Sequence, residues 1–264
     1  MSQYQLAAQK LTAYMRLPFP QKEMLTHRII SHALEQSKKP LVSSSFGKDS
    51  TVLLHLVKSH TWKFDVVFNN TGVELKETLE FRDFLVKEWN LIFHEVKPKL
   101  SFWDCVKKWG YPKESRNSKT GERREPHCCK HLKEVPMKRF VKDNDFDLNF
   151  VGLLGDEGRQ RRWAFIQKGC AIYDHKTWGI KKCIPLIFWK QSDVWQYIKK
   201  YELPINEAYA KYRLERTGCA PCTGHIGWEK SMVKTNPALY RHIIKTPMIE
   251  SFSINSCGKG DVEK

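Results

Sequence analysis

The chain has 264 residues, of which 41% are hydrophobic, so it can bury a substantial core as one large domain or one domain with an appendage. Its 45 Lys and Arg residues exceed its 29 Asp and Glu residues, and the net charge of +16 indicates a polyanionic partner or substrate. It contains no secretory signal pattern and no apolar run of about 18 residues. We therefore expect a cytoplasmic protein without a membrane span.

Apolar residues recur at helical spacing in residues 3–15 and 21–36, which predicts two helices in an N-terminal segment, residues 1–38. From there on, short β-branched runs alternate with longer amphipathic runs, a pattern typical of βαβ units. Residues 39–204 are therefore predicted to form an α/β fold, an open, mostly parallel twisted sheet with helices on both faces. Residues 205–264 are expected to form a small C-terminal appendage of loops and short helices that carries cysteines.

The segment LVSSSFGKDS, residues 41–50, joins a predicted strand to a predicted helix. In a parallel sheet such a loop directs backbone N–H groups toward an anion at the carboxyl ends of the strands. Gly47 allows the backbone to approach a phosphate, Lys48 supplies a cation, and three serines supply hydroxyl donors: Ser43, Ser45 and Ser50. The alternative is a turn without a ligand, in which these residues are present because turns favour them.

The same segment resembles the Ser-x-Gly-Lys-Asp-Ser signature of the PP-loop ATP pyrophosphatases. Residues 68–85 and 185–209 are similar to segments of the phosphoadenosine phosphosulfate (PAPS) reductase branch of that superfamily, and residues 152–163 resemble its Arg- and Glu-containing motif. The resemblance implies ATP with Mg²⁺, Lys48 and Asp49 as catalytic residues, and a larger set of nucleotide-binding residues. That set is Ser43, Ser45, Phe46, Gly47, Lys48, Asp49, Ser50, Thr71, Gly72, Glu157, Arg159 and Arg161.

Four of the eight cysteines form two pairs, Cys128-Cys129 and Cys219-x-x-Cys222. In a reducing compartment such pairs are used for metals more often than for disulfides, and four thiolates can bind zinc or a [4Fe–4S] cluster. The arrangement resembles the [4Fe–4S] motif of assimilatory adenylylsulfate reductases, so we prefer the iron–sulfur cluster to zinc. Three other cysteines stand among apolar or mixed residues and are expected to be core thiols: Cys105, Cys170 and Cys183.

Cys257 lies in the C-terminal tail and is followed by Gly258. Adenylylsulfate reductases carry a nucleophilic thiol in a similar tail, which makes Cys257 a candidate catalytic residue by resemblance. A tail cysteine without a chemical role is the alternative.

Positive charge is concentrated between Arg116 and Lys142 and again between Arg159 and Arg162. Lys and Arg side chains that neutralise phosphates give salt-sensitive binding that depends little on base sequence. The predicted nucleic-acid contacts are Arg116, Arg123, Arg124, Lys130 and Arg162.

Three functions fit these patterns. The first is an ATP pyrophosphatase that adenylylates an oxygen of nucleic acid for sulfur insertion, similar to the enzymes of DNA phosphorothioation systems, with a cysteine desulfurase as a candidate sulfur donor. It is favoured because the chain keeps Lys48 and Asp49, a pair that sulfonucleotide reductases commonly lose. The second is a PAPS or adenylylsulfate reductase, and the third is a noncatalytic iron–sulfur module that binds nucleic acid. The sequence leaves the choice between DNA and tRNA and the oligomeric state open.

Overall fold

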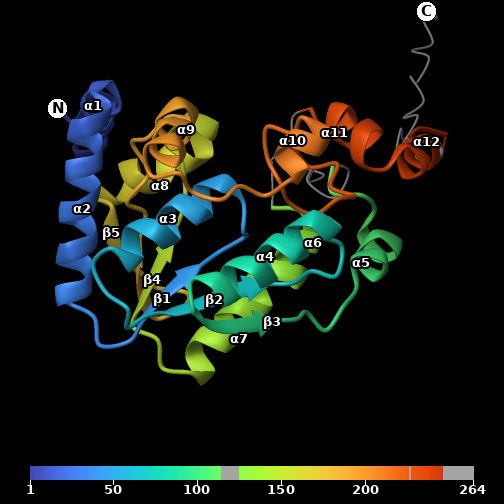
Figure 1. Ribbon diagram of the computed structural model, residues 1–264, viewed down its shortest axis with the longest axis horizontal. Helices are drawn as coiled ribbons and strands as arrows, with labels where there is room; N and C mark the ends of the chain where they lie inside the picture. Colours follow the sequence, from blue (N-terminus) through green and yellow to red (C-terminus); the bar gives the residue numbers. More distant parts are fainter. Residues whose placement is uncertain (114–124, 226, 246–264) are drawn as a thin grey trace, which may run out of the picture.

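A computed structural model describes residues 1–113, 125–225 and 227–245. Its centre is a six-stranded sheet with the order β3-β2-β1-β4-β6-β5 (Figure 1). Five strands run parallel, and β5 pairs antiparallel with β6 at one edge. The strands are β1 (Pro40–Ser43), β2 (Asp65–Asn69), β3 (Ile92–Val96), β4 (Leu148–Val151), β5 (Ile172–His175) and β6 (Ile180–Cys183). The predicted open, mostly parallel α/β sheet is confirmed.

Helices surround this sheet and lie on both of its faces. The first group is α1 (Gln3–Arg16), α2 (Phe19–Glu35), α3 (Lys48–Lys58), α4 (Lys76–Glu88), α5 (Phe102–Trp109), α6 (His127–Cys129), the π-helix η1 (Lys130–Glu134) and α7 (Val135–Asp143). The second group is the 3₁₀ turn η2 (Gly155–Glu157), α8 (Arg159–Lys168), α9 (Gln191–Lys200), α10 (Ala208–Tyr212), α11 (Trp228–Thr235) and α12 (Pro237–Lys245). None of the helices in the described ranges is long and apolar enough to cross a bilayer.

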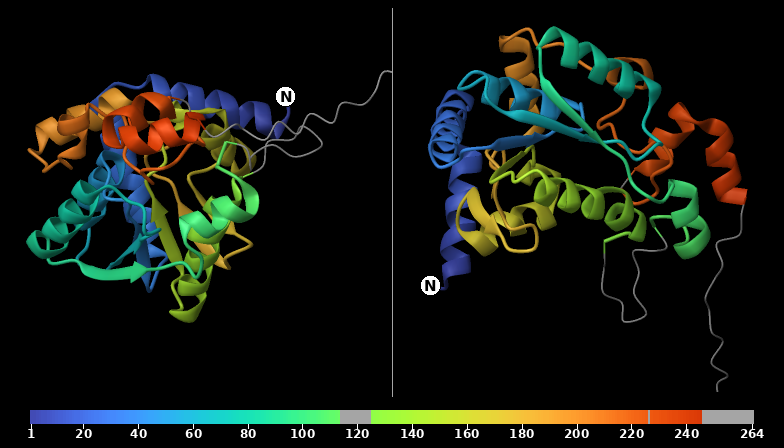
Figure 2. Two further views of the ribbon diagram at one scale, coloured as in Figure 1. Left: turned by 90° about the vertical axis from the view of Figure 1, so that its right-hand side faces the viewer. Right: turned by 90° about the horizontal axis from the view of Figure 1, so that it is seen from below.

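Alternate residues of the central strands enter two hydrophobic clusters, one on each face of the sheet. In β1, Val42 packs into the large cluster with α2, α3, α8 and α9, whereas Leu41 packs into a smaller cluster against α7. Val66 and Val67 of β2 divide between the same two clusters. The right-hand view of Figure 2 shows α4 and α7 on opposite sides of the strands. This alternation follows from the twofold side-chain period of a strand.

The N-terminal helices pack onto this α/β body. A buried ion pair joins Lys22 of α2 to Asp193 of α9, with 2.6 Å between Nζ and Oδ2. Helix α1 lies alongside α8 (Figure 1). The cysteine predictions are correct for Cys105 and Cys183, which are buried, and wrong for Cys170, which is exposed. Cys170 follows Gly169, which ends α8 in the left-handed conformation, so the chain turns toward solvent there.

Candidate active site

The Gly-Lys loop connects β1 to α3 in the predicted position. Phe46 adopts a positive φ of 52°. Its fully buried ring packs edge-on against Phe68 and Phe93, so it anchors the loop to the hydrophobic core. Gly47 is the N-cap of α3, and its carbonyl accepts hydrogen bonds from the hydroxyls of Ser50 and Thr51. The N-terminus of a helix favours negative charge, so the loop presents an anion-binding end.

Little space separates this loop from the C-terminal part of the chain. A Cβ atom at Gly47 would lie 2.7 Å from Thr217 Oγ1 and 3.1 Å from the Tyr209 hydroxyl. The backbone N–H of Lys48 donates a hydrogen bond of 3.0 Å to the same Tyr209 hydroxyl. Only glycine therefore fits at position 47 while Tyr209 and Thr217 remain in place.

Lys48 and Asp49 form a partly buried ion pair, with 3.3 Å between Nζ and Oδ2. Burial raises the pKa of the Asp49 carboxyl, nearby Glu157 raises it further, and Lys48 opposes both effects. The second oxygen of this carboxylate, Oδ1, is buried and has no hydrogen-bond partner among the described residues. An unpaired buried carboxylate oxygen in an anion-binding loop fits a magnesium ligand, because Mg²⁺ prefers oxygen ligands beside phosphates.

A cavity of about 570 Å³ opens from this loop across the carboxyl ends of β1, β2 and β4. Seven of the predicted nucleotide-binding residues line it: Ser43, Ser45, Gly47, Asp49, Ser50, Glu157 and Arg161. Five others do not line it: Phe46, Lys48, Thr71, Gly72 and Arg159. The structure therefore assembles one nucleotide-sized cavity from segments that are far apart in the sequence.

The loop that follows β2 connects this region to the cysteines. Gly72 has a φ of 79° and donates its N–H to the Asn70 side chain, so it forms a tight turn. The Thr71 hydroxyl donates to Glu74 and lies 3.4 Å from the sulfur of Cys219. Glu74 pairs with Cys219 in an isolated antiparallel bridge. Thr71 thus contacts a predicted metal ligand.

The segment after β4 carries the predicted acid and arginines. Glu157 and Arg161 form an ion pair, and both side chains line the nucleotide cavity. Arg159 and Arg162 are exposed on the outer side of α8. Only one of the three arginines of α8 therefore faces this cavity.

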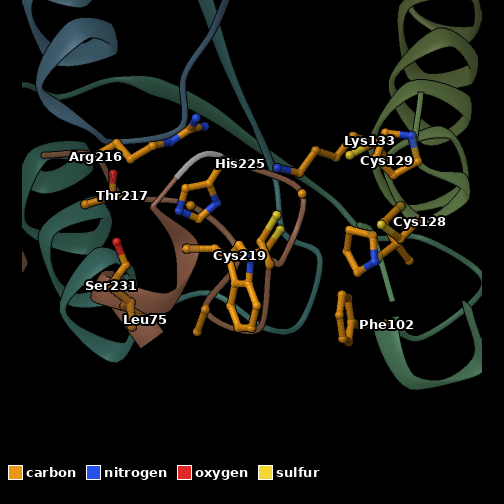
Figure 3. Close-up of a pocket in the computed structure, with 18 of the residues that line it drawn as sticks. Leu75, Phe102, Cys128, Cys129, Lys133, Arg216, Thr217, Cys219, His225 and Ser231 are labelled. Atoms are coloured by element: carbon orange, nitrogen blue, oxygen red, sulfur yellow. The ribbon is translucent and has the colours of Figure 1, made fainter. Parts of the chain in front are cut away.

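All four predicted metal-binding cysteines line a second cavity of about 320 Å³. Cys128 and Cys129 come from α6, and Cys219 and Cys222 come from the C-terminal segment (Figure 3). Two histidines hold α6 and η1 to α5, since His127 and His131 both stack on the Trp109 ring, with centroids 5.0 and 4.7 Å away. Short π-helices such as η1 are often found at functional sites.

The thiols of Cys128 and Cys129 form a hydrogen-bonded pair. The hydrogen bond from Cys129 lowers the pKa of Cys128, and the same interaction raises the pKa of Cys129, with burial adding to the increase. Burial also raises the pKa of Cys222. A bound metal would hold these cysteines as thiolates.

Lys133 of η1 extends toward the cysteines. The negative charge of Cys219, with which its ammonium group also hydrogen-bonds, raises the pKa of Lys133, and Cys129 and Glu74 add to the effect. Figure 3 shows the Lys133 side chain reaching toward the Cys219 side of the cavity. Lys133 therefore places a positive charge beside the four cysteines.

The four cysteines are of the ligand type that holds an iron–sulfur cluster, and all of them line one cavity. Among the described residues, no three His, Cys, Asp or Glu side chains converge closely enough to hold a single metal ion. The cationic Lys133 also suits the negative charge of a thiolate-bound cluster.

The two cavities adjoin along one wall. Five residues line both of them: Lys133, Arg161, Arg216, Thr217 and Gly218. Three of the five side chains are basic. The wall between the two cavities is therefore lined mainly by basic side chains.

Four predicted residues lie outside the described ranges: Arg116, Arg123, Arg124 and Cys257. Lys130 is exposed on η1, two residues from Cys128. Sequence reasoning missed Arg216, Thr217 and Tyr209. Arg216 and Thr217 line both cavities, and Thr217 and Tyr209 lie against the Gly-Lys loop. A basic residue three positions before Cys219 was the available signal for Arg216.

The family model for the phosphoadenosine phosphosulfate reductase domain matches residues 39–225. The chain belongs to this family. Its nucleotide cavity thus lies in the fold of the PP-loop superfamily, which confirms the resemblance seen in the sequence.

Two curated relatives are about equally similar in sequence. An uncharacterised protein of Methanocaldococcus jannaschii is 30% identical over 212 residues, which make up 78% of this chain and 40% of that protein. An adenosine 5'-phosphosulfate reductase of Bacillus thuringiensis is 30% identical over 202 residues, 75% of this chain and 80% of the reductase. The chain thus spans less than half of the archaeal relative and most of the bacterial one.

Solved structures share the fold. A PAPS reductase from Candida auris has a TM-score of 0.53 and 21% identity, with 70% of this chain and 83% of the reductase covered. The FMN adenylyltransferase of Candida glabrata in complex with ATP has a TM-score of 0.54 and 15% identity, with 82% and 70% covered. At these identities the likeness concerns the fold.

Proposed function

We propose that the protein uses ATP to adenylylate an oxygen atom of nucleic acid so that sulfur can replace it, as in DNA phosphorothioation. The observation that carries this proposal is the common wall of the nucleotide cavity and the four-cysteine cavity, in which Lys133, Arg161 and Arg216 face both sides. Three basic side chains at the junction suit a substrate that brings its own phosphates. The net charge of +16 suits a polyanion as well.

The proposed chemistry has two steps. An oxygen of the substrate attacks the α-phosphorus of ATP, the bond to the bridging oxygen breaks, and pyrophosphate leaves with the electron pair of that bond. A sulfur nucleophile, supplied as sulfide by a donor such as a cysteine desulfurase, then attacks the activated position. AMP leaves with the original oxygen, so one oxygen is exchanged for one sulfur without a net redox change.

Residues of the Gly-Lys loop would stabilise the departing pyrophosphate. The hydroxyls of Ser45 and Ser50 lie 3.4 Å apart at the cavity wall, beside the N-terminus of α3. Asp49 and Glu157 would hold Mg²⁺, which neutralises phosphate charge when it is bound. Preorganised donors at the position where charge develops typically contribute about two to three orders of magnitude in rate.

At the other cavity, Cys128, Cys129, Cys219 and Cys222 would hold a [4Fe–4S] cluster. Such a cluster supplies electron transfer and an iron atom at which a sulfur species can be held. Lys133 would keep an anionic sulfur species on the side of the nucleotide, because its ammonium group lies between the two cavities.

A second candidate function is adenylylsulfate reduction. It is favoured by the relative from Bacillus thuringiensis, which carries that name and aligns over 80% of its length. In that reaction the Cys257 thiol would attack the sulfur of adenylylsulfate, AMP would leave, and a thiol reductant such as a thioredoxin would release sulfite from the S-sulfonate.

The experiment that tests the proposal measures pyrophosphate release from ATP by anaerobically prepared protein, alone and with DNA or tRNA. We expect nucleic acid to stimulate release several-fold and Lys48→Met to reduce it by about 10²-fold, because the buried lysine charge behind the loop is removed while its volume is kept. Lys58→Met, at the other end of α3, is the matched control and should retain full activity.

Sulfite formation from adenylylsulfate is measured in parallel. Cys257-dependent sulfite, together with ATP turnover that no nucleic acid stimulates, would replace the proposal with the reductase function. If the protein binds nucleic acid but forms neither pyrophosphate nor sulfite, the remaining function is that of a noncatalytic binding module.

A further inference from the structure

Helix α8 has two chemically different sides near its N-terminus. Arg161 is partly buried and lines both the cysteine cavity and the nucleotide cavity, whereas Gln160 is exposed and lines the cysteine cavity alone. Arg159, Arg162 and Trp163 are exposed. Positions 159, 162 and 163 are neighbours on one helical face, because residues three and four apart lie on the same side.

The exposed side carries an aromatic pair. Trp163 stacks on Tyr4 of the adjacent helix α1, with ring centroids 6.0 Å apart and planes inclined by 24°. Trp163 remains 49% exposed and Tyr4 remains 54% exposed in this arrangement. Two large rings that pack together and still present half of their surface to solvent form a preassembled platform.

The charge beside this platform is positive and uncompensated. Helix α8, with the sequence RQRRWAFIQK, contains no acidic residue. Within the described parts of the chain, neither Arg159 nor Arg162 forms an ion pair, whereas Arg161 on the inner side is paired with Glu157. Two guanidinium groups next to exposed rings suit a partner that offers phosphates together with flat aromatic groups.

We propose that the outer face of α8, formed by Arg159, Arg162 and Trp163 together with Tyr4, binds single-stranded nucleic acid that leads to the cavity mouth at Arg161. A base must be unstacked to lie on an aromatic side chain, and bases in a duplex are already stacked on each other. Proteins that bind single strands combine aromatic platforms with basic side chains in this way. The inference rests on the proposed function and specifies the strandedness of its substrate.

The position of this face explains how a strand would reach the reaction site. The first turn of α8 contributes Arg161 to the inner cavities and Arg159 and Arg162 to the surface, and Trp163 follows directly. Gln160, next to Arg161, is exposed and also lines the cysteine cavity, so the surface that carries Trp163 continues to the rim of that cavity.

The test measures binding of a fluorescent oligothymidine and of a duplex of equal length by anisotropy at several salt concentrations, without ATP. We expect the single strand to bind more tightly than the duplex. Trp163→Ala should weaken single-strand binding by at least about fivefold and leave the salt slope unchanged. The double variant Arg159→Gln, Arg162→Gln should reduce the slope by about 0.7 for each phosphate that an arginine no longer neutralises.

Trp62→Ala is the matched control. Trp62 is 68% exposed, follows α3 and has a lysine, Lys58, 4.3 Å from its ring centroid, so it offers an aromatic ring and a cation on another surface. Equal effects of Trp163→Ala and Trp62→Ala, equal affinity for duplex and single strand, or no binding at all would each overturn the inference. Pyrophosphate release stimulated by duplex DNA in the same preparation would show that the proposed function survives that failure. Melting curves exclude a loss of fold in either variant.

Discussion

Cys128 and Cys129 illustrate how adjacent residues can share one site. They are consecutive in α6, their thiols hydrogen-bond to each other, and both face the cavity that Cys219 and Cys222 complete. In an ordinary helix, consecutive side chains point about 100° apart. The short α6 passes directly into the π-helix η1, and this irregular turn accompanies the placement of both thiols on one cavity.

We predict that protein prepared without oxygen contains iron and sulfide and is brown, and that Cys128→Ser removes most of the visible absorption, because a serine hydroxyl is a poor ligand for iron. Visible spectroscopy with iron and sulfide analysis provides the measurement. Cys170→Ser is the control, since Cys170 is exposed and lies outside the cavity. Stoichiometric zinc and no iron in the anaerobic protein would show that the four cysteines serve a zinc site.

At the residue scale, the sequence patterns predicted which residues belong to the site better than they predicted which way the side chains point. The four cysteines and the Gly-Lys loop could be predicted because each is a local motif. Arg159 could not be distinguished from Arg161 in a run of basic residues, since only the helix geometry decides that one faces solvent and the other the cavity. Arg216 and Tyr209 belong to the site through contacts between distant segments, which local patterns do not contain.

At the element scale, α4 and α10 are joined by one carboxylate. Glu77 of α4 is almost fully buried and accepts hydrogen bonds from Lys211 at 2.6 Å and Tyr212 at 2.8 Å. Burial raises the pKa of Glu77, but the hydrogen bonds from Lys211, the backbone and Tyr212 outweigh it, so the pKa lies below its ordinary value of 4.5. Because the folded state binds this proton more weakly than the unfolded state, the carboxylate stabilises the fold above pH 4.5 and the contribution disappears as the pH falls through the lower folded value.

We predict that Glu77→Gln lowers the free energy of unfolding by about 1–3 kcal/mol at pH 7, where the charged hydrogen bonds are intact. The difference from the wild type should shrink as the pH falls below 4.5. Denaturant unfolding at a series of pH values measures it. Glu80→Gln on the exposed side of the same helix is the control and should change the stability little. A difference that stays constant down to about pH 3 would contradict this assignment.

The elements themselves were predictable in proportion to their burial. Strands β1, β2 and β4 are nearly continuous apolar runs, as expected for strands buried on both faces, and the sequence shows them clearly. The hairpin of β5 and β6 was not predicted, because its segments IYDH and IKKC contain as many polar as apolar residues. β5 is the edge strand here, and both strands are only partly buried, so their apolar pattern is weak.

At the scale of the whole molecule, the N-terminal helices share the main hydrophobic core. Leu11, Ile30 and Ala33 belong to the same buried cluster as the strands, and Lys22 forms its buried pair with Asp193. We predict that Lys22→Met lowers the free energy of unfolding by about 3–5 kcal/mol, because it leaves a buried carboxylate without its cation. The chain should still unfold in a single transition.

Circular dichroism and tryptophan fluorescence measured on the same denaturant series would test this. Lys76→Met, which removes a solvent-exposed pair with Glu80, should cost less than about 1 kcal/mol. An early, separate transition in Lys22→Met would show instead that residues 1–38 fold as an independent unit.

The close approach at Gly47 couples the Gly-Lys loop to the C-terminal segment, although the two regions are far apart in the sequence. Since a single added methyl group at position 47 would collide with the Thr217 side chain, a larger residue there requires Thr217 to move or to be replaced. In a chimera that receives residues 205–225 from another family member, we expect the loop to keep its conformation only where the side chains at positions 209 and 217 leave the same space beside position 47. The segment that carries Cys219 and Cys222 is therefore coupled sterically to the loop it covers.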